Sequence, residues 1–541
     1  MKRSLFYLPC LLAVALAGCE DPTKDTGTGG NSATGDATIS DDTYNNSGDF
    51  LEQWDAYTTG DMKVITLTWS ASSVDISGTC DGVTVTADGT DVTVVSTAKK
   101  VQYVLSGTCS DGSFKVYSDK KFVLQLNGIT LHNPSGPAIN IQKGKMAEDD
   151  GGYPHKAVYV LVTDGTTNTL TDGTYAQEVT VDGVEEDQKA CFFSEGQLIF
   201  SGAGTLNVTG NNRHAVRSDD YIRLRNSVTM NITANGEDGI NGKDYLIVDG
   251  GTHTINVSAD KGKGLKSDTI LIAGGSTNIT CTSSTAEGIE ADYLTIDDGL
   301  VECLAKDDGI NAAYSIVING GYIYTRGTNN DGLDSNGTIT INGGVIVAVG
   351  TQVPEEGIDC DQNTFTITGG IILGIGGASS TPTSSTCTQP SVLYGASCTA
   401  GTRLSLLDAD GNIVLSYVPE TTLTQMTLLL SLPALSQGTA YTFVSAGTYT
   451  ASTGSTTSVS TGTTSASTDT SSASSVSDAI TFHNLTNAGT LSSPTTLTTA
   501  TLSSMVTTVG NVSSGGGGNP GGGGNPGGNP GGGGGGRPGG R

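Results

Sequence analysis

Acidic side chains recur through the middle of the chain at a nearly constant interval, usually just before a glycine. The aligned glycines are 25, 24, 21, 23 and 25 residues apart: Gly239, Gly264, Gly288, Gly309, Gly332 and Gly357. Stretches such as DDGINAA at 307–313 and NDGLDSN at 330–336 add carboxylates and amides beyond the glycine. Carboxylate and amide oxygens suit Ca²⁺, which takes six to eight oxygen ligands in a flexible shell. The pattern therefore predicts calcium, provided that the fold stacks the repeats.

Stacked repeats would place equivalent residues about 4.8 Å apart, in columns. The column before the glycine reads His214, Asp238, Lys263, Glu287, Asp308, Asp331 and Glu356; the column two positions after it reads Arg217, Asn241, Lys266, Glu290, Asn311, Asp334 and Asp359. Two carboxylates about 5 Å apart repel by roughly 1 kcal/mol in water and about 3 kcal/mol at a protein surface, unless a cation lies between them. We therefore predict six calcium ligands: Asp308, Asp331, Asp334, Glu356, Asp359 and Asp361. A solvated acidic edge that prevents wrong strand pairing is the alternative.

The elements that must position these acids are short strands. LIVDGG at 246–251, IVINGG at 316–321 and FTITGG at 365–370 alternate apolar and polar residues and end in Gly-Gly turns, and no segment shows a helical period. Repeats of this length without helices predict a solenoid, because a propeller blade needs about 40 to 45 residues. We expect an all-β right-handed parallel β-helix in which each coil buries its Ile, Leu and Val on the next. A small C-terminal β segment and disordered tails complete the expected architecture.

The N-terminus predicts export and lipid anchoring. Lys2 and Arg3 precede an apolar run that is too short to span a bilayer, and LAGC follows at 16–19. This ending resembles a bacterial lipobox, which implies cleavage before Cys19 and acylation of its thiol; an ordinary signal peptide is the alternative. No later apolar run is long enough to cross a membrane. We expect an exported protein, anchored to the bacterial membrane by its lipid at the cell surface or in the periplasm.

Composition divides the chain into segments. They are a signal peptide at 1–18, a flexible tether at 19–48, the β-helix at 49–378, a C-terminal β segment at 379–450, a Ser/Thr-rich linker at 451–477, a weak β segment at 478–512 and a Gly/Pro-rich tail at 513–541. Loss of the leader would take the formal net charge from −28 to −30. Such an acidic surface excludes nucleic acid, which is itself anionic, as a partner. It favours cations, or a polyanion that metal ions bridge to the protein.

Eight cysteines remain after the leader, an even number that permits disulfides in an exported protein. We expect Cys80 with Cys109 and Cys387 with Cys398 as the first candidate pairs. Cys281 and Cys303 are a further, diagonal candidate. Buried free thiols are the alternative.

Several stretches carry a family resemblance. They are YVLSGTCSDGSFKV at 103–116, KKFVLQLNGITLHNPSGPAINIQ at 120–142, VTDGTTNTLTDG at 162–173 and LSLLDADGNIVLSYVPE at 404–420, together with the glycine repeats. Residues 64–450, about 70% of the chain, resemble the carbohydrate-binding, pectate-lyase-like β-helix lipoproteins. The resemblance implies calcium and the binding, without cleavage, of an acidic polysaccharide such as polygalacturonate.

Basic residues beside the acidic columns fit this hypothesis. We predict direct glycan contacts from Lys243, Lys263, Lys266 and Arg217, with the metal bridging the remaining carboxylates. Charge pairing across coils, for example between Lys266 and Glu290, is the alternative. We expect a monomer whose partners are an acidic polysaccharide and, through the lipid, a membrane.

Two other functions remain open. A calcium-dependent polysaccharide lyase would need a base such as Arg326 near the metal. Asp307-Asp308 and Asp297-Asp298 make poor catalytic pairs, because neighbouring strand residues point to opposite faces. A structural surface protein or adhesin is the third possibility.

The lipid anchor is directly testable. Cys19→Ala removes the thiol that would be acylated, so the protein should move from the membrane fraction to the soluble fraction after cell lysis. Retention of the variant in membranes would contradict lipidation at this position.

Overall fold

The computed structural model describes residues 62–118, 120–143, 158–225, 227–361, 363–451, 456–458 and 479–514 of the 541-residue chain. All of them belong to one compact unit, Asp36–Arg541. The predicted leader, tether and lipidation site lie outside the described residues, as do most of the linker and nearly all of the tail. The described residues form strands and turns, and among them no helix is long and apolar enough to cross a membrane.

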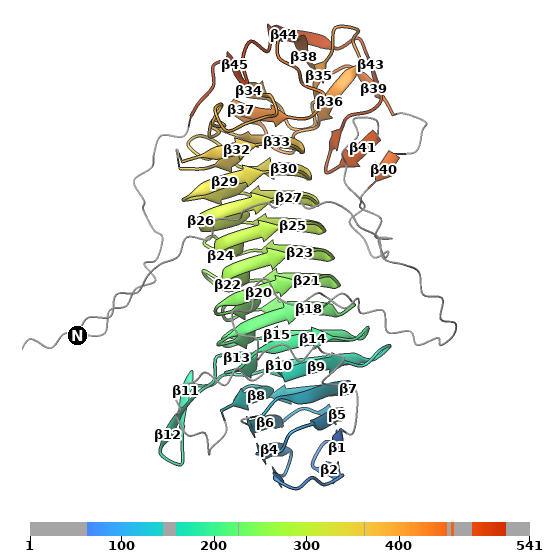
Figure 1. Ribbon diagram of the computed structural model, residues 1–541, viewed down its shortest axis with the longest axis vertical. Helices are drawn as coiled ribbons and strands as arrows, with labels where there is room; N and C mark the ends of the chain where they lie inside the picture. Colours follow the sequence, from blue (N-terminus) through green and yellow to red (C-terminus); the bar gives the residue numbers. More distant parts are fainter. Residues whose placement is uncertain are drawn as a thin grey trace, which may run out of the picture. The chain divides into compact units, whose positions relative to one another are not determined.

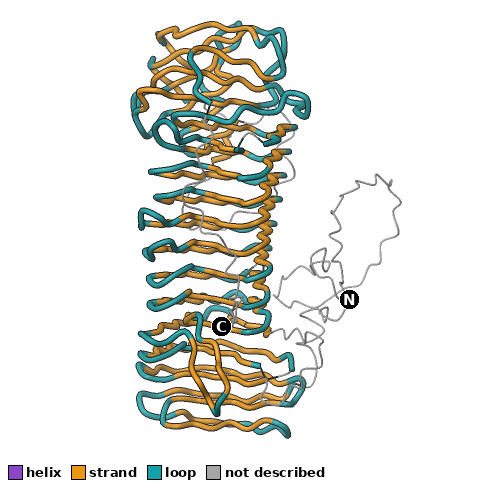
Figure 2. The backbone as a smooth tube through the Cα atoms, turned by 90° about the vertical axis from the view of Figure 1, so that its left-hand side faces the viewer, coloured by secondary structure: helices purple, strands orange, loops and turns teal. Residues whose placement is uncertain are grey.

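Parallel strands stack coil upon coil to form a solenoid (Figure 1), and Figure 2 shows the coils as successive rungs. Each full coil contributes one strand to each of three sheets. The first sheet pairs, in order, β4 (Asp91–Ser96), β6 (Ser113–Ser118), β8 (Ile139–Gln142), β13 (Ala190–Ser194), β16 (His214–Ser218), β19 (Ile240–Gly242), β22 (Lys263–Ile272), β24 (Glu287–Ile296), β26 (Ile310–Ile318), β28 (Leu333–Ser335) and β31 (Ile358–Asp359).

The other two sheets have the same parallel pairing. The second sheet contains β1 (Lys63–Trp69), β5 (Val101–Cys109), β7 (Phe122–Asn133), β9 (Val158–Val162), β14 (Leu198–Ser201), β17 (Tyr221–Leu224), β20 (Tyr245–Val248), the C-terminal halves of β22, β24 and β26, β29 (Thr338–Ile341) and β32 (Phe365–Ile367). The third sheet contains the end of β7, β10 (Thr167–Asp172), β15 (Thr205–Gly210), β18 (Thr229–Ala234), β21 (Thr252–Val257), β23 (Ser276–Cys281), β25 (Leu300–Ala305), β27 (Tyr322–Gly327), β30 (Val345–Val349) and β33 (Ile371–Gly376). The prediction of an all-β parallel solenoid is confirmed.

Short antiparallel elements flank the first coils. β2 (Val74–Ser77) pairs with β1, and β3 (Val83–Asp88) pairs with β4. β11 (Glu178–Val181) and β12 (Val184–Asp187) form a separate hairpin.

The far end of the solenoid carries the C-terminal strands. β37 (Leu423–Ser431) pairs antiparallel with both β33 and β34 (Ser391–Cys398), and β45 (Val506–Gly510) pairs parallel with β34. A seven-stranded sheet contains β40 (Thr456–Ser458), β41 (Ala479–Phe482), β42 (Leu485–Thr486), β36 (Ile413–Tyr417), β35 (Leu404–Leu407), β38 (Ala440–Ser445) and β44 (Thr495–Thr501). β39 (Thr448–Thr450) pairs with β43 (Thr490–Ser492). Residues after the linker thus return to the folded unit.

Apolar side chains stack in columns inside the solenoid. One column of fully buried residues runs through the first sheet: Ile240, Leu265, Ile289, Ile310, Leu333 and Ile358. Because neighbouring strands lie about 4.8 Å apart, each aliphatic side chain packs directly on its equivalent in the next coil. This packing fixes the register on which the outward-facing columns depend.

Two kinds of glycine hold the coil shape. The second glycine of each Gly-Gly turn has a positive φ, for example 81° at Gly321, a conformation that other residues adopt only with strain. Gly309 and its equivalents serve another purpose. A Cβ on Gly309 would lie 2.1 Å from the Thr325 hydroxyl and 2.7 Å from the carbonyl oxygen of Gly332. These glycines are needed because adjacent coils approach closely there.

The disulfide hypotheses were wrong, since all eight cysteines of the described residues are free thiols. Cys387 lies in the solenoid core, whereas Cys398 lies in the separate core beneath the C-terminal sheet. Cys281 and Cys303 both point inward, but Cys303 pairs in register with Ile279, two residues from Cys281. That offset puts their Cα atoms about 8 Å apart, beyond the usual limit of about 7 Å for a disulfide.

The close approach at Gly309 can be tested by Gly309→Ala. The added methyl group should push the coils apart and cost about 1–3 kcal/mol of unfolding free energy. Denaturant unfolding monitored by circular dichroism measures this. Gly274→Ala is the comparison variant and should cost clearly less, because its tightest contact would be one backbone oxygen at 3.0 Å, against 2.1 Å at Gly309. Equal stability of the two variants would contradict the argument.

Candidate metal centre

In three repeats the aspartate before the glycine links its coil to the next. The Asp308 carboxylate accepts a hydrogen bond from the backbone N–H of Asp331 at 3.0 Å, and the Asp331 carboxylate accepts one from the N–H of Glu356. The Asp238 carboxylate accepts the N–H of Lys263 at 2.9 Å in the same way. The side chains at this position therefore lie along the solenoid axis, between coils, and are buried.

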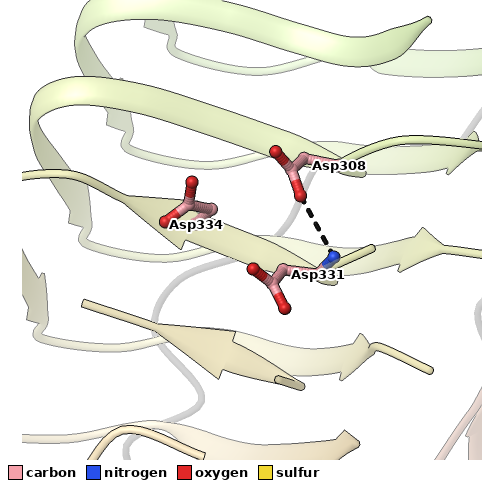
Figure 3. A group of neighbouring side chains, drawn as sticks. All are labelled: Asp308, Asp331 and Asp334. Carbon is pink, nitrogen blue, oxygen red and sulfur yellow. Dashed lines mark hydrogen bonds between the residues drawn. The ribbon is translucent and has the colours of Figure 1, made fainter. Parts of the chain in front are cut away.

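Three predicted ligands come together in one cluster. Asp308 and Asp331 precede β26 and β28, and Asp334 lies on β28; Figure 3 shows the three carboxyl groups gathered between two coils. One oxygen from each lies within 4.8 Å of the others. Since Ca²⁺–oxygen distances are 2.3–2.6 Å, a single ion could contact all three. The structure thus brings three of the six predicted ligands together, and their role as calcium ligands stays a prediction.

Burial and mutual repulsion disfavour three negative charges in this cluster. Burial, with the Asp334 and Asp359 carboxylates nearby, raises the pKa of Asp331 to about 9. Burial and the charges of Asp308 and Asp359 raise the pKa of Asp334 to about 9 as well. The pKa of Asp308 is also raised well above its usual value by burial and by Asp331. At neutral pH the cluster must therefore hold protons or a cation.

The other three predicted ligands belong to the following coil. Glu356 is buried, Asp359 pairs in register with Asp334, and Asp361 is exposed. The Asp359 carboxylate accepts hydrogen bonds from the Asp361 N–H at 2.9 Å and the Ser380 hydroxyl at 3.0 Å. These residues extend the acidic column beyond the three-residue cluster.

Lysine neutralises the same columns earlier in the solenoid. The Lys263 ammonium lies 2.6 Å from Glu287 and 2.7 Å from Glu290, and Lys266 lies 2.7 Å from Glu290. Burial would lower the pKa of Lys263, but the two glutamates raise it above its usual value. Charge pairing across coils, the alternative to glycan contact, is thus present. Buried Lys263 is enclosed by its partners.

The two remaining predicted glycan contacts lie on earlier coils. Arg217 donates to Asp219 and to the Asn241 side-chain oxygen, both at 2.9 Å. Lys243 is exposed, and its nearest carboxylate partner is Asp244 at 3.6 Å. Of the four basic residues, Lys243 has the ammonium that is most accessible to a ligand.

Arg326, the base that a lyase would need, is held elsewhere. Its guanidinium pairs with Glu420 and donates to the Thr421 hydroxyl at 3.0 Å. Arg326 lies on β27 of the third sheet, whereas Asp334 lies on β28 of the first sheet. The sequence could not reveal this pairing, because Glu420 is 94 residues away.

Two comparisons with known proteins found similarity to this chain. A family model described as "Carbohydrate-binding domain-containing protein" matches residues 81–372, more than half of the chain. The chain belongs to this family. It is also similar to a solved structure, a polysaccharide lyase-like protein from C. thermocellum prepared as a gadolinium derivative. That similarity has 22% sequence identity and a TM-score of 0.35, and covers 56% of this chain and 96% of the other. A comparison with curated proteins finds no match.

The raised pKa values predict how the stability of this carbohydrate-binding family member depends on pH. Asp331 and Asp334 bind protons up to pH about 9 in the folded state, but an ordinary Asp has a pKa of 3.8. The folded state therefore binds more protons than the unfolded state between these values. The free energy of unfolding should fall as pH rises from about 4 to 9 in the presence of a chelator. Thermal melts across this range measure the effect.

Asp334→Asn should flatten this pH dependence and raise the melting temperature at pH 8, because the neutral amide removes one repelling charge. Asp297→Asn is the control, since Asp297 is exposed at the Asp-Asp-Gly turn of its coil and accepts a hydrogen bond from Asn319. If both variants show the wild-type dependence on pH, the cluster does not cause it.

Proposed function

We propose that this protein binds an acidic polysaccharide of the polygalacturonate kind, without cleaving it, through calcium held along the acidic columns of the first sheet. Membership in a carbohydrate-binding family supports polysaccharide binding in general. The acidic substrate and the ion are proposed here from the chemistry of the site.

The observation that carries the proposal is the cluster of Asp308, Asp331 and Asp334, whose oxygens lie within 4.8 Å of one another. An anionic glycan would be repelled by a protein of net charge −28 unless cations intervene. A cation held by the cluster would remove the repulsion among the three carboxylates and attract the glycan.

Calcium suits this site better than magnesium. The available ligands are carboxylate oxygens on adjacent coils, and Asn311 lies beside them, donating to Asp308 at 3.2 Å. Ca²⁺ accepts irregular shells of six to eight oxygens, whereas Mg²⁺ requires nearly ideal octahedral geometry. Three protein carboxylates leave coordination positions for water or for glycan carboxylates. The extended acidic column, with Asp359 and Asp361, offers further positions along the glycan.

The surroundings of the cluster support binding without cleavage. Lyase chemistry needs a base beside the metal-bound sugar. Arg326 is committed to Glu420, and the nearest ammonium along the column, Lys263, is enclosed by Glu287 and Glu290. We further propose that the protein is a monomer, exported and anchored to the bacterial membrane through a lipid on Cys19, which would display the solenoid to polysaccharide outside the membrane.

Calcium dependence is the central test. Immobilised polygalacturonate should retain the wild-type protein in calcium and release it on addition of chelator. Asp334→Ala combined with Asp359→Ala should raise the Kd by about tenfold or more, because even second-shell changes at metal sites typically cost 10–100-fold in metal affinity.

The matched control is Asp75→Ala with Asp88→Ala, which removes the same charge from exposed positions near the start of the solenoid. This control should bind like the wild type. Undiminished binding in chelator would contradict the calcium bridge. Accumulation of unsaturated uronate products, which absorb ultraviolet light, would establish a lyase instead.

A further inference from the structure

We propose that Tyr293 and Tyr314 form an aromatic platform on which a sugar ring of the bound polysaccharide stacks, next to the acidic cluster. This inference rests on the proposed function and adds to it a subsite that recognises the ring itself rather than its charge.

The two tyrosines stand out by their exposure. Tyr293 is 50% exposed and Tyr314 is 56% exposed, and they are the aromatic residues among the exposed large hydrophobic side chains of the described chain. Their ring centroids lie 5.2 Å apart with planes inclined by 32°. Several other tyrosines are tied into the fold by their hydroxyl groups, as Tyr117 is to Glu186 at 2.7 Å. Exposed aromatic rings held side by side are costly in water and are typical of binding sites.

An irregularity in the sheet lies where the two rings meet. In regular parallel pairing, Tyr293 lies beside Ser315, and Ala291 lies beside Ala312. β26 therefore contains one more residue than β24 between these pairs, and Tyr314 is one of the two bulge residues; its ring lies beside that of Tyr293. Bulges commonly redirect a side chain at a functional position.

The next coil leaves Tyr314 uncovered. Ser335 pairs with Ala312 and Thr338 with Ser315, so Gly337 lies beside Tyr314. A Cβ on Gly337 would lie 1.9 Å from the carbonyl oxygen of Tyr314, which shows how closely the two backbones approach. Gly337 has no side chain to cover the ring. On the other side of the pair, Thr269 stands beside Tyr293 in register and is smaller than a ring.

The platform adjoins the acidic column. Tyr314 follows Asn311 by three residues, and Asn311 pairs in register with Asp334. Three residues span at most about 10 Å, so a short stretch of glycan could reach both places. Tyr293 likewise follows Glu290, the partner of Lys266, by three residues.

The surroundings favour a sugar over a protein partner. The other exposed large hydrophobic side chains of the described residues lie on other strands or loops: Val64, Ile76, Val184, Leu304, Val353 and Leu497. Asp292 directly precedes Tyr293 on β24, and Lys266 and Asp268 lie on β22 of the coil before it. An isolated pair of rings is too small for the apolar core of a stable protein interface. It matches the C–H face of a pyranose ring, whose hydroxyl and carboxylate groups point to polar neighbours and to the cation.

The test is a binding titration of polygalacturonate oligosaccharides in calcium. Tyr293→Ala with Tyr314→Ala should weaken binding about tenfold, the scale expected for loss of roughly 1.4 kcal/mol of aromatic contact. Calcium affinity, the sensitivity to chelator and the melting temperature should stay unchanged, because both rings are exposed. Tyr314→Phe should bind like the wild type, since it keeps the ring and removes only the hydroxyl group.

Leu304→Ala is the matched control, because it removes an exposed apolar side chain from β25 on the third sheet. Wild-type glycan affinity in the double tyrosine variant would overturn the platform. A wild-type protein that binds no acidic glycan in calcium would instead overturn the proposed function. If the double variant changes only self-association in ultracentrifugation, the pair contacts a second copy of the chain, and the platform is again wrong.

Discussion

The core and the charged columns of this molecule both depend on the distance between neighbouring strands in a parallel stack. Because every coil repeats the same path about 4.8 Å above the last, each side chain meets its own equivalent. For the inward Ile, Leu and Val this repetition produces a continuous apolar core. For charged positions it stacks like charge on like charge, which a buried column cannot tolerate without neutralisation.

The solenoid neutralises its columns differently along its length. At Glu287 and Glu290 an internal ammonium, that of Lys263, lies between the carboxylates. At Asp238 burial would raise the pKa, but His214, Lys266 and Asn241 hold it below its usual value. At Asp308, Asp331 and Asp334 the raised pKa values show that the protein supplies too little positive charge. The same architecture thus moves from internal ion pairs to a cluster whose charge a bound cation would balance, as we propose.

Close packing of the backbone makes these columns possible. Asp308 can reach the N–H of Asp331 in the next coil only because Gly309 lets the two coils come together. The C-terminal strands depend on the same regularity, since β37 extends the third sheet by pairing with β33. Glu420, close to β37, then engages Arg326 of the solenoid.

The sequence by itself determined the solenoid and the columns. The interval between glycines and the alternation before each Gly-Gly turn depend on local geometry and a fixed repeat, and the register of Asn311 with Asp334 and Asp359 followed from counting. Only the tertiary structure decided which members of a column share one site. Asp308, Asp331 and Asp334 converge because the first two side chains lie along the axis, whereas Lys263 turns into its glutamates and is withdrawn from the surface. The pairing of Arg326 with Glu420 and the bulge at Tyr314 escaped prediction, and the free cysteines matched the alternative rather than the expected pairs. Each depends on offsets of one or two residues, or on contacts between distant segments, that a repeat pattern does not encode.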